Sequence, residues 1–176
     1  MKRSELAHVL RASAAILNDT SFSSVGSQAV LLPLEVPPAD SLVSNEIDLY
    51  PALHPEKADL IDGAIGAHST FHDTFGYHAD GVGSEAARLP KDRMSRAVLT
   101  YFGDITAICP DLHDLVVLKC AAGKDKDADF DRTLLLSGLV KPDILLERIA
   151  TLDPAKHTVE HIMQWKQRRV QESSIP

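Results

Sequence analysis

Apolar residues recur at helical spacing near both ends of the chain. From Ser4 to about Asn18 the apolar side chains fall on one helical stripe, formed by Leu6, Val9, Leu10, Ala14 and Leu17. Such a stripe lets one face of a helix pack on a sheet. Later helices are predicted from Asp111, as N-cap, to about Ala122, from the charged run 124–129 to Ser137, from Pro142 to Ala150 and from Pro154 to Glu172.

Shorter apolar runs in the middle of the chain predict strands. Residues 23–30 form a small and apolar run that breaks at Gly26-Ser27, which indicates a strand, a tight turn and the first turn of a helix. Glu46–Tyr50 and Tyr77–Val82 are predicted strands, and residues 97–101 and 105–109 a hairpin. Pro55 starts a predicted helix that ends near Gly66. Strands between terminal helices indicate an α+β domain, 1–176, with a sheet-containing part to about 110 and a helical part over about 111–172.

The turn at Gly26-Ser27 is the first candidate for chemistry. A helix that begins there has free backbone N–H groups and a partial positive charge at its start, and Ser27 adds a hydroxyl. These groups suit a phosphate. An ordinary strand-to-helix turn is the simpler interpretation when the turn is taken alone.

Two carboxylates follow on a predicted strand. Side chains alternate along a strand, so Glu46 and Asp48 share one face while Ile47 and Leu49 turn toward a core. Neighbouring carboxylates repel each other unless a cation lies between them, and Mg²⁺ prefers oxygen ligands. A phosphate seat beside a carboxylate pair is what metal-assisted transfer from a nucleoside triphosphate requires. The alternative is the solvated face of an edge strand.

These residues resemble the signature of the nucleotidyltransferase (polymerase-beta-like) superfamily, in which a glycine-serine turn precedes an acidic-x-acidic strand. The chain is more closely similar to a bacterial family of that fold related to the AbiE-type toxin nucleotidyltransferases. Three further stretches match it, Ala58–Gly66, Phe71–Tyr77, and His113-Asp114-Leu115 with Lys119 and Lys126-Asp127, so the likeness runs from about Val25 to Leu139. Two features depart from the pattern: eighteen residues separate Ser27 from Glu46, and the first acid is Glu rather than Asp.

The resemblance implies a nucleotidyltransferase fold, with a small mixed or antiparallel sheet, and transfer of a nucleoside monophosphate to a hydroxyl. Mg²⁺ or Mn²⁺ would be held by Glu46 and Asp48, with Asp80, or second Asp104, as third carboxylate. Gly26, Ser27 and Gln28 would grip the phosphates. Lys119 would neutralise phosphate charge, and Asp127 would orient it or act as a base. The expected setting is a toxin–antitoxin or other defence system, with RNA such as tRNA, or a protein, as acceptor, and a cognate antitoxin or toxin as partner.

Other interpretations stay open beside this one. The domain would instead bind nucleotide or a partner with little catalysis, as an antitoxin-like component. For Lys119 and Asp127, the alternative is a buried ion pair that joins two helices. Histidines 68, 72 and 78 with Asp73 suggest a zinc hydrolase, although their irregular spacing fits no compact zinc motif.

Composition narrows the setting. No apolar run approaches the roughly 20 residues of a membrane span and no secretory leader is recognised, so we expect a cytoplasmic protein without a membrane partner. The net charge of −7 argues against a general nucleic-acid coat. Cys109 and Cys120 are expected to be buried, reduced thiols. The cations Lys166, Arg168 and Arg169 suit either RNA phosphates or a solvated helix end.

Overall fold

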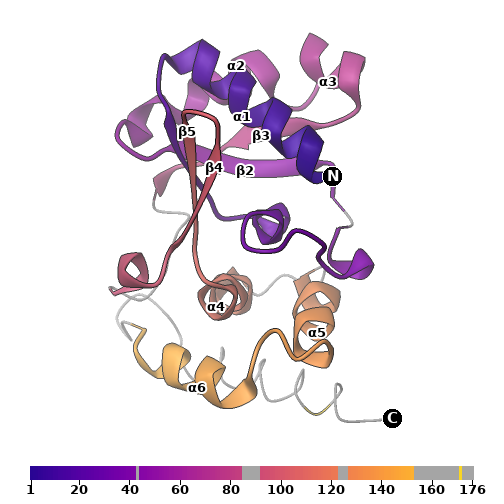
Figure 1. Cartoon of the computed structure of the whole chain (residues 1–176), viewed down its shortest axis with the longest axis vertical. Coiled ribbons are helices and arrows are strands. Elements are labelled where there is room, and N and C mark those ends of the chain that lie inside the picture. Colours follow the sequence, from indigo (N-terminus) through magenta and orange to yellow (C-terminus); the bar gives the residue numbers. More distant parts are fainter. Residues whose placement is uncertain (43, 85–91, 123–126, 153–170, 172–176) are drawn as a thin grey trace.

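A computed structural model describes residues 1–42, 44–84, 92–122, 127–152 and 171 (Figure 1). A mixed five-stranded sheet carries helices of the first half of the chain, and three later helices lie beyond one end of it. The α+β prediction is therefore confirmed. Buried apolar side chains from Met1 to Leu152 belong to a single core cluster.

The sheet has the order β3-β2-β1-β5-β4. Its strands are β1 (Ser21–Ser24), β2 (Glu46–Pro51), β3 (His78–Gly81), β4 (Val98–Phe102) and β5 (Ile105–Cys109). Strand β1 pairs antiparallel with β2 and parallel with β5, while β2 and β3 are parallel and β4 and β5 form the expected hairpin. Because β2 lies between β1 and β3, the edge-strand interpretation of Glu46 and Asp48 is wrong.

The two faces of the sheet have different chemistry. Along β2 the side chains alternate, with Ile47 and Leu49 buried and Glu46 and Asp48 partly exposed. Residues paired in register project to the same side, so Asp80, opposite Asp48, joins the acids. We call this side, which carries Glu46, Asp48, Tyr50, His78 and Asp80, the acidic face.

Helices α1 (Arg3–Leu17) and α2 (Ala58–Ile65) lie on the other side of the sheet. The predicted stripe of α1 is buried at Leu6, Val9, Leu10 and Leu17, and Ser13 is buried with it. Helix α2 follows the short 3₁₀ helix η3 (Pro55–Lys57) and ends at Gly66, as the proline and glycine predicted. Gly81 lets α2 approach β3, because a Cβ built there would lie 2.0 Å from the carbonyl oxygen of Ala58.

The segment between β2 and β3 closes with a short helix, α3 (Thr70–Phe75). The Ser69 hydroxyl accepts a hydrogen bond from the amide of His72 at 3.1 Å, which caps the helix, and Gly76 ends it at a positive φ of 75°. Rings at this edge gather around His8, whose Nδ1 lies 2.8 Å from the Tyr77 hydroxyl. Helix α3 is thereby held beside β3.

Helices α4 (Leu112–Ala122), α5 (Ala128–Leu136) and α6 (Pro142–Ala150) form the helical part. Asp111 caps α4 as predicted, because its Oδ1 accepts the amide of Asp114 at 2.8 Å. Gly138, at φ 70°, follows the end of α5. Cys109 and Cys120 are buried thiols that form no disulfide with each other, as expected. The helix predicted over 154–172, with Lys166, Arg168 and Arg169, and the charged start at 124–126 lie outside the described residues.

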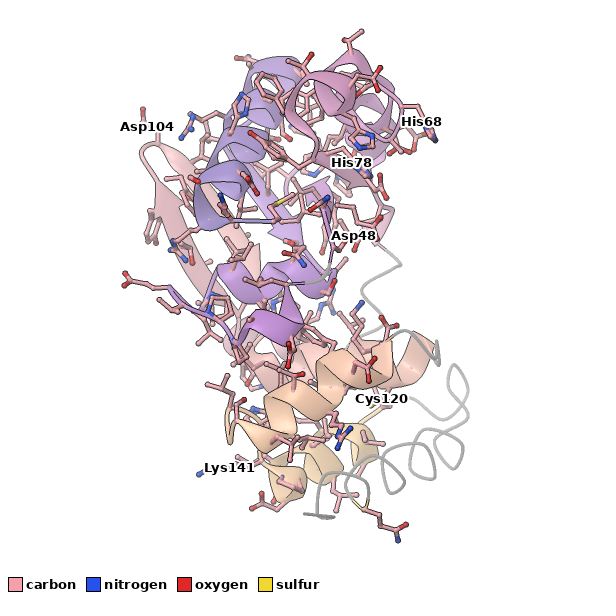
Figure 2. All side chains as sticks on the ribbon, turned by 90° about the vertical axis from the view of Figure 1, so that its right-hand side faces the viewer. Asp48, His68, His78, Asp104, Cys120 and Lys141 are labelled. Atoms are coloured by element: carbon pink, nitrogen blue, oxygen red, sulfur yellow. The ribbon has the colours of Figure 1, made fainter. Side chains whose placement is uncertain are left out.

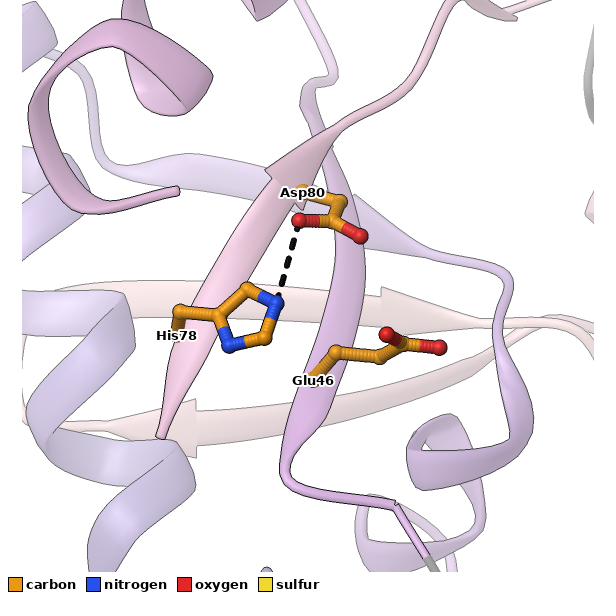
Figure 3. Close-up of side chains that lie close together, drawn as sticks. All are labelled: Glu46, His78 and Asp80. Carbon is orange, nitrogen blue, oxygen red and sulfur yellow. Dashed lines mark ion pairs between the residues drawn. The ribbon is translucent and has the colours of Figure 1, made fainter. Parts of the chain in front are cut away.

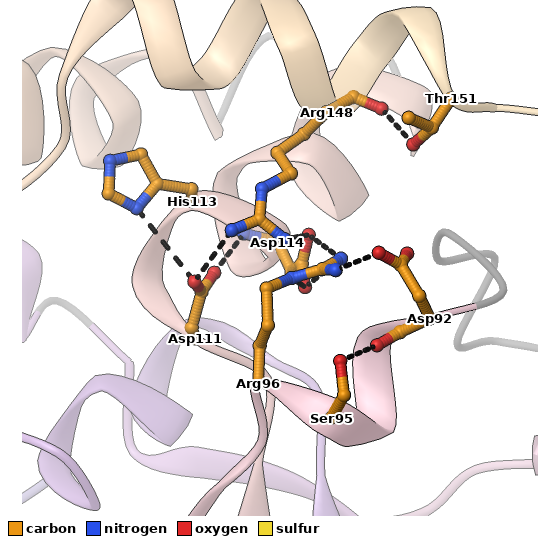
Figure 4. A network of polar contacts seen from close by, with 8 residues as sticks. All are labelled: Asp92, Ser95, Arg96, Asp111, His113, Asp114, Arg148 and Thr151. Atoms are coloured by element: carbon orange, nitrogen blue, oxygen red, sulfur yellow. Dashed lines mark hydrogen bonds and ion pairs between the residues drawn. The ribbon is translucent and has the colours of Figure 1, made fainter.

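An ionic network joins the hairpin to the helical part (Figure 4). Arg96, just before β4, donates two hydrogen bonds to the carboxylate of Asp114, at 3.0 and 3.1 Å. The Asp114 side chain has no solvent exposure, and Arg148 of α6 lies 3.8 Å from its Oδ1 and 3.6 Å from Oδ2 of Asp111. Ion pairs therefore link the segment before β4 to α4 and α6.

No helix in the described part of the chain is both long and apolar enough to cross a lipid bilayer.

Candidate functional site

The hinge between β1 and the following helix is built from small residues. Strand β1 ends at Ser24, and Gly26 is the N-cap of the 3₁₀ helix η1 (Ser27–Leu31). The expected strand, turn and helix are therefore present, but the helix is a 3₁₀ helix of 5 residues. Pro33 lies two residues beyond the end of η1, and because proline lacks a backbone N–H it cannot continue the hydrogen bonds of the helix. The dipole of the short helix η1 is weaker than that of a full α-helix. If a phosphate binds here, the backbone amides of the hinge would contribute more to its binding than the helix dipole.

Gly26 lies directly against the Asp48 carboxylate. A Cβ built on Gly26 would come within 1.7 Å of Asp48 Oδ2, so any side chain at this position would have to displace the carboxylate. The backbone is fixed as well, because the Val25 amide donates to the Asp48 carbonyl oxygen at 3.2 Å. The φ of Gly26 is −77°, an ordinary value, so glycine is needed here for space and not for conformation. The structure thus brings the hinge and the second acid together, and Figure 2 shows where Asp48 lies on the sheet.

The two residues after Gly26 have different environments. Ser27 is half-buried, whereas Gln28 has no exposure, and its Oε1 and Nε2 find no hydrogen-bond partner among the described residues. Buried amides are normally bonded. The side chain of Gln28 therefore lies on the buried side of η1. Its expected role in binding phosphate stays a prediction.

Glu46, His78 and Asp80 form a compact cluster on the acidic face (Figure 3). One ligand atom from each lies within 4.8 Å of the other two. His78 Nε2 lies 3.3 Å from Asp80 Oδ1. Burial raises the pKa of Asp80; His78 opposes this, and the negative charges of Glu46 and Asp62 add to it. The cluster therefore concentrates acid groups that a cation would stabilise.

Two of the three histidines, which are six residues apart in the sequence, lie in contact. The rings of His72, on α3, and His78, on β3, have centroids 4.5 Å apart. His68 is exposed and lies 6.4 Å from His72 by ring centroids, and Asp73 is exposed too. Alternation on β3 predicted that His78 and Asp80 share a face. The contact with His72 depends on how α3 packs, for which the sequence pattern gave no signal.

The predicted Lys119 and Asp127 meet between α4 and α5. Lys119 Nζ lies 3.0 Å from Asp127 Oδ1, and the two side chains are 15% and 6% exposed. The ammonium also lies 5.9 Å from the centre of the Phe130 ring. The ion pair expected under the structural interpretation is thus present. Its role toward a nucleotide stays a prediction.

Asp104 does not belong to this site. It is exposed in the turn between β4 and β5, at the opposite end of the strand order from β3, and Figure 2 shows it far from Asp48. A hairpin turn explains the residue, because Gly103 takes a φ of 67° beside it. The prediction of Asp104 as an alternative third carboxylate is therefore wrong. Asp80 is the acid that lies beside Glu46.

A small hollow, with a cavity volume of about 20 Å³, opens to solvent next to the hinge. Its walls come from the end of β1, from β2 and β5, and from the segment before β4. They are formed by Ser23, Ser24, Val25, Tyr50, Arg93, Met94, Ala97, Ile108 and Pro110. Tyr50 follows Asp48 by two residues on the same face, so the hollow starts about 7 Å along the strand from the acid. Sequence reasoning missed it, because its walls come from four separate segments.

Comparisons with protein-family models, with characterised proteins and with solved structures returned no match to this chain. The geometry of the acidic face therefore carries the functional argument.

Proposed function

We propose that the chain is a nucleotidyltransferase that moves a nucleoside monophosphate from a nucleoside triphosphate to a hydroxyl acceptor and releases pyrophosphate. The observation that carries the proposal is the contact between the Gly26 hinge and the Asp48 carboxylate. This contact brings the glycine-serine turn, which is expected to bind phosphate, next to the second acid, which is expected to bind the metal. A solvated strand face has no need of a glycine pressed against its carboxylate.

The residues of the acidic face fit a divalent cation. Glu46, Asp48 and Asp80 offer oxygen ligands from adjacent positions of β2 and β3, and hard cations prefer such ligands. Mg²⁺ or Mn²⁺ bound there would neutralise charge on the triphosphate and on the acceptor oxygen. The amides of the hinge and the Ser27 hydroxyl would then bind the outer phosphates.

In the proposed reaction the acceptor oxygen forms a bond to the α-phosphorus while the bond from that phosphorus to the pyrophosphate oxygen breaks. Pyrophosphate leaves with the electron pair of the broken bond. The proton of the acceptor hydroxyl passes to solvent, and a cation held by Glu46, Asp48 and Asp80 would favour its loss. Lys119, held by Asp127, remains the predicted cation for the pyrophosphate, as the second part of this proposal.

The base of the nucleoside is proposed to lie over the hollow beside Tyr50, which is too small to enclose it. The walls of the hollow include the residues directly before Gly26, at the end of β1, and Tyr50, two residues beyond Asp48 on β2. The hollow is therefore next to the expected phosphate site on both strands. The separation of about 7 Å along β2 suits a sugar and base attached to phosphates at the hinge. Tyr50 and Met94 supply flat and adaptable surface for a base.

A direct assay tests the proposed function. The purified chain is incubated with each of the four α-³²P-labelled NTPs, with Mg²⁺ or Mn²⁺, and with or without total RNA or tRNA. We expect label on RNA or protein with at least one NTP, and none after EDTA. Binding of a nucleotide without transfer under every condition would contradict the enzyme and support the binding module that resembles an antitoxin. A toxin–antitoxin setting would then be tested by expression with and without adjacent genes.

The nucleoside seat leads to a separate prediction. Tyr50→Ala should raise the dissociation constant of the NTP about 10-fold or more, since one base stacked on an aromatic ring contributes about 1–3 kcal/mol. Tyr50→Phe keeps the ring and should bind nearly as the parent chain does. Fluorescence anisotropy of a labelled NTP measures both. Equal loss in the two variants would show that the hydroxyl, and not the ring, makes the contact.

A further inference from the structure

An imidazole lies among the acids of the proposed metal site. In the parallel register of β2 and β3, Glu46 is opposite His78 and Asp48 is opposite Asp80. Glu46, His78 and Asp80 therefore point into one space from two adjacent strands, as Figure 3 shows. Their ligand atoms already lie within 4.8 Å of one another.

The imidazole of His78 is buried and faces the carboxylates with one ring nitrogen. His78 is only 8% exposed, and its Nδ1 is buried without a hydrogen-bond partner among the described residues. Its Nε2 faces the Asp80 carboxylate at 3.3 Å. The nitrogen that faces the carboxylates is Nε2, while the unpartnered Nδ1 lies on the other side of the ring. Nε2 could therefore join the oxygens of Glu46 and Asp80 as a metal ligand.

The ligand set decides which cation suits the site. Mg²⁺ favours oxygen ligands alone, whereas imidazole nitrogen suits first-row transition metals, which bind mixed N and O sites more tightly. We propose that Glu46, His78 and Asp80 bind a first-row transition-metal dication and that His78 makes the chain prefer it to Mg²⁺. This inference rests on the proposed function only for the catalytic role of the metal; binding of the metal itself does not depend on it.

Mn²⁺ alone is the probe, because its electron paramagnetic resonance reports both affinity and ligands. The full chain is stripped with EDTA and titrated with Mn²⁺, and Mg²⁺ is then added as competitor. We expect tight binding of Mn²⁺ that Mg²⁺ displaces only at about 10-fold or greater excess. Pulsed resonance should show coupling of the bound Mn²⁺ to a ¹⁴N nucleus, which only a directly bound nitrogen ligand gives.

His78→Gln keeps a polar side chain and removes the ring. It should abolish the ¹⁴N coupling and weaken Mn²⁺ binding about 10- to 100-fold, the range for altered metal-site partners, while Mg²⁺ binding changes less. His68→Gln is the matched control, because His68 is exposed on the same segment, and it should retain both signals. Absence of ¹⁴N coupling in the parent chain overturns the proposal even if the variant fails to fold. Equal affinity for Mn²⁺ and Mg²⁺ overturns it too.

The outcome separates this inference from the proposed function. Nitrogen-bound Mn²⁺ without label transfer would keep the metal site and reject the transferase. Transfer that runs on Mg²⁺ alone, with no nitrogen ligand, would keep the transferase and reject the role of His78.

Discussion

We expect Asp48→Asn to slow nucleotidyl transfer by at least about 10²-fold, the usual cost of removing one charge-stabilising group from an active site. The amide keeps the shape of the side chain and loses the negative charge that binds a cation. Initial rates of label transfer at saturating NTP and metal measure the effect. Asp59→Asn, at an exposed position of α2, is the control and should leave the rate unchanged.

Gly26→Ala should reach a similar loss by another route. Its methyl group would overlap Asp48 Oδ2 at 1.7 Å, so the carboxylate has to move away from the hinge. Overpacking of this kind costs about 1–3 kcal/mol of stability, which urea denaturation would register. Gly63→Ala is the matched control, since nothing lies within 4 Å of a Cβ there, and it should leave both rate and fold intact.

The double variant tests whether the two residues act as a unit. If Gly26→Ala acts by displacing the Asp48 carboxylate, it should add little to the loss already caused by Asp48→Asn. Independent roles would instead multiply the two losses. Multiplied losses would contradict the contact as the basis of the proposed site.

The parts of the fold with strong periodicity were predictable. The stripe of α1, the alternation of β2 and the hairpin around Gly103 each follow from residues close in sequence. The strand order is different, because the pairing of β1 with β5 joins residues more than eighty positions apart. No local pattern encodes that partner. The short length of η1 is a local effect in contrast, because Pro33 lies two residues beyond its end.

The candidate site was predictable where it follows strand alternation. Glu46 and Asp48 share a face, and Asp80 lies beside them because β3 is parallel to β2 in register. The ring of His72 and the walls of the hollow come from segments brought in by packing, so spacing alone could not place them. Asp104 was a poorer candidate from the start, because the hairpin turn at Gly103 explains an aspartate at this position without any role in a site.

The largest expected effect on stability lies in the network around Arg96. Arg96→Met should lower the free energy of unfolding by about 3–5 kcal/mol at pH 8, the usual cost of removing one partner of a buried ion pair. Without Arg96, the fully buried Asp114 carboxylate keeps, among the described residues, only the cation of Arg148 at 3.8 Å and faces the negative Asp111. Asp92→Ala removes the other partner of Arg96, but that aspartate is 62% exposed, so a loss below about 1 kcal/mol is expected.

The same variant should change how stability depends on pH. Burial, with the charge of Asp111, raises the pKa of Asp114 to about 6, while Arg96 opposes the rise. The folded chain therefore holds this proton between pH about 4 and 6 where the unfolded chain has lost it, so this group makes stability fall as pH rises through that range. Removing Arg96 raises the pKa of Asp114 further and extends the fall to higher pH. The deficit of Arg96→Met in urea denaturation should consequently be smaller at pH 5 than at pH 8, and a deficit that is equal at both would show that the guanidinium acts through its packing and not its charge.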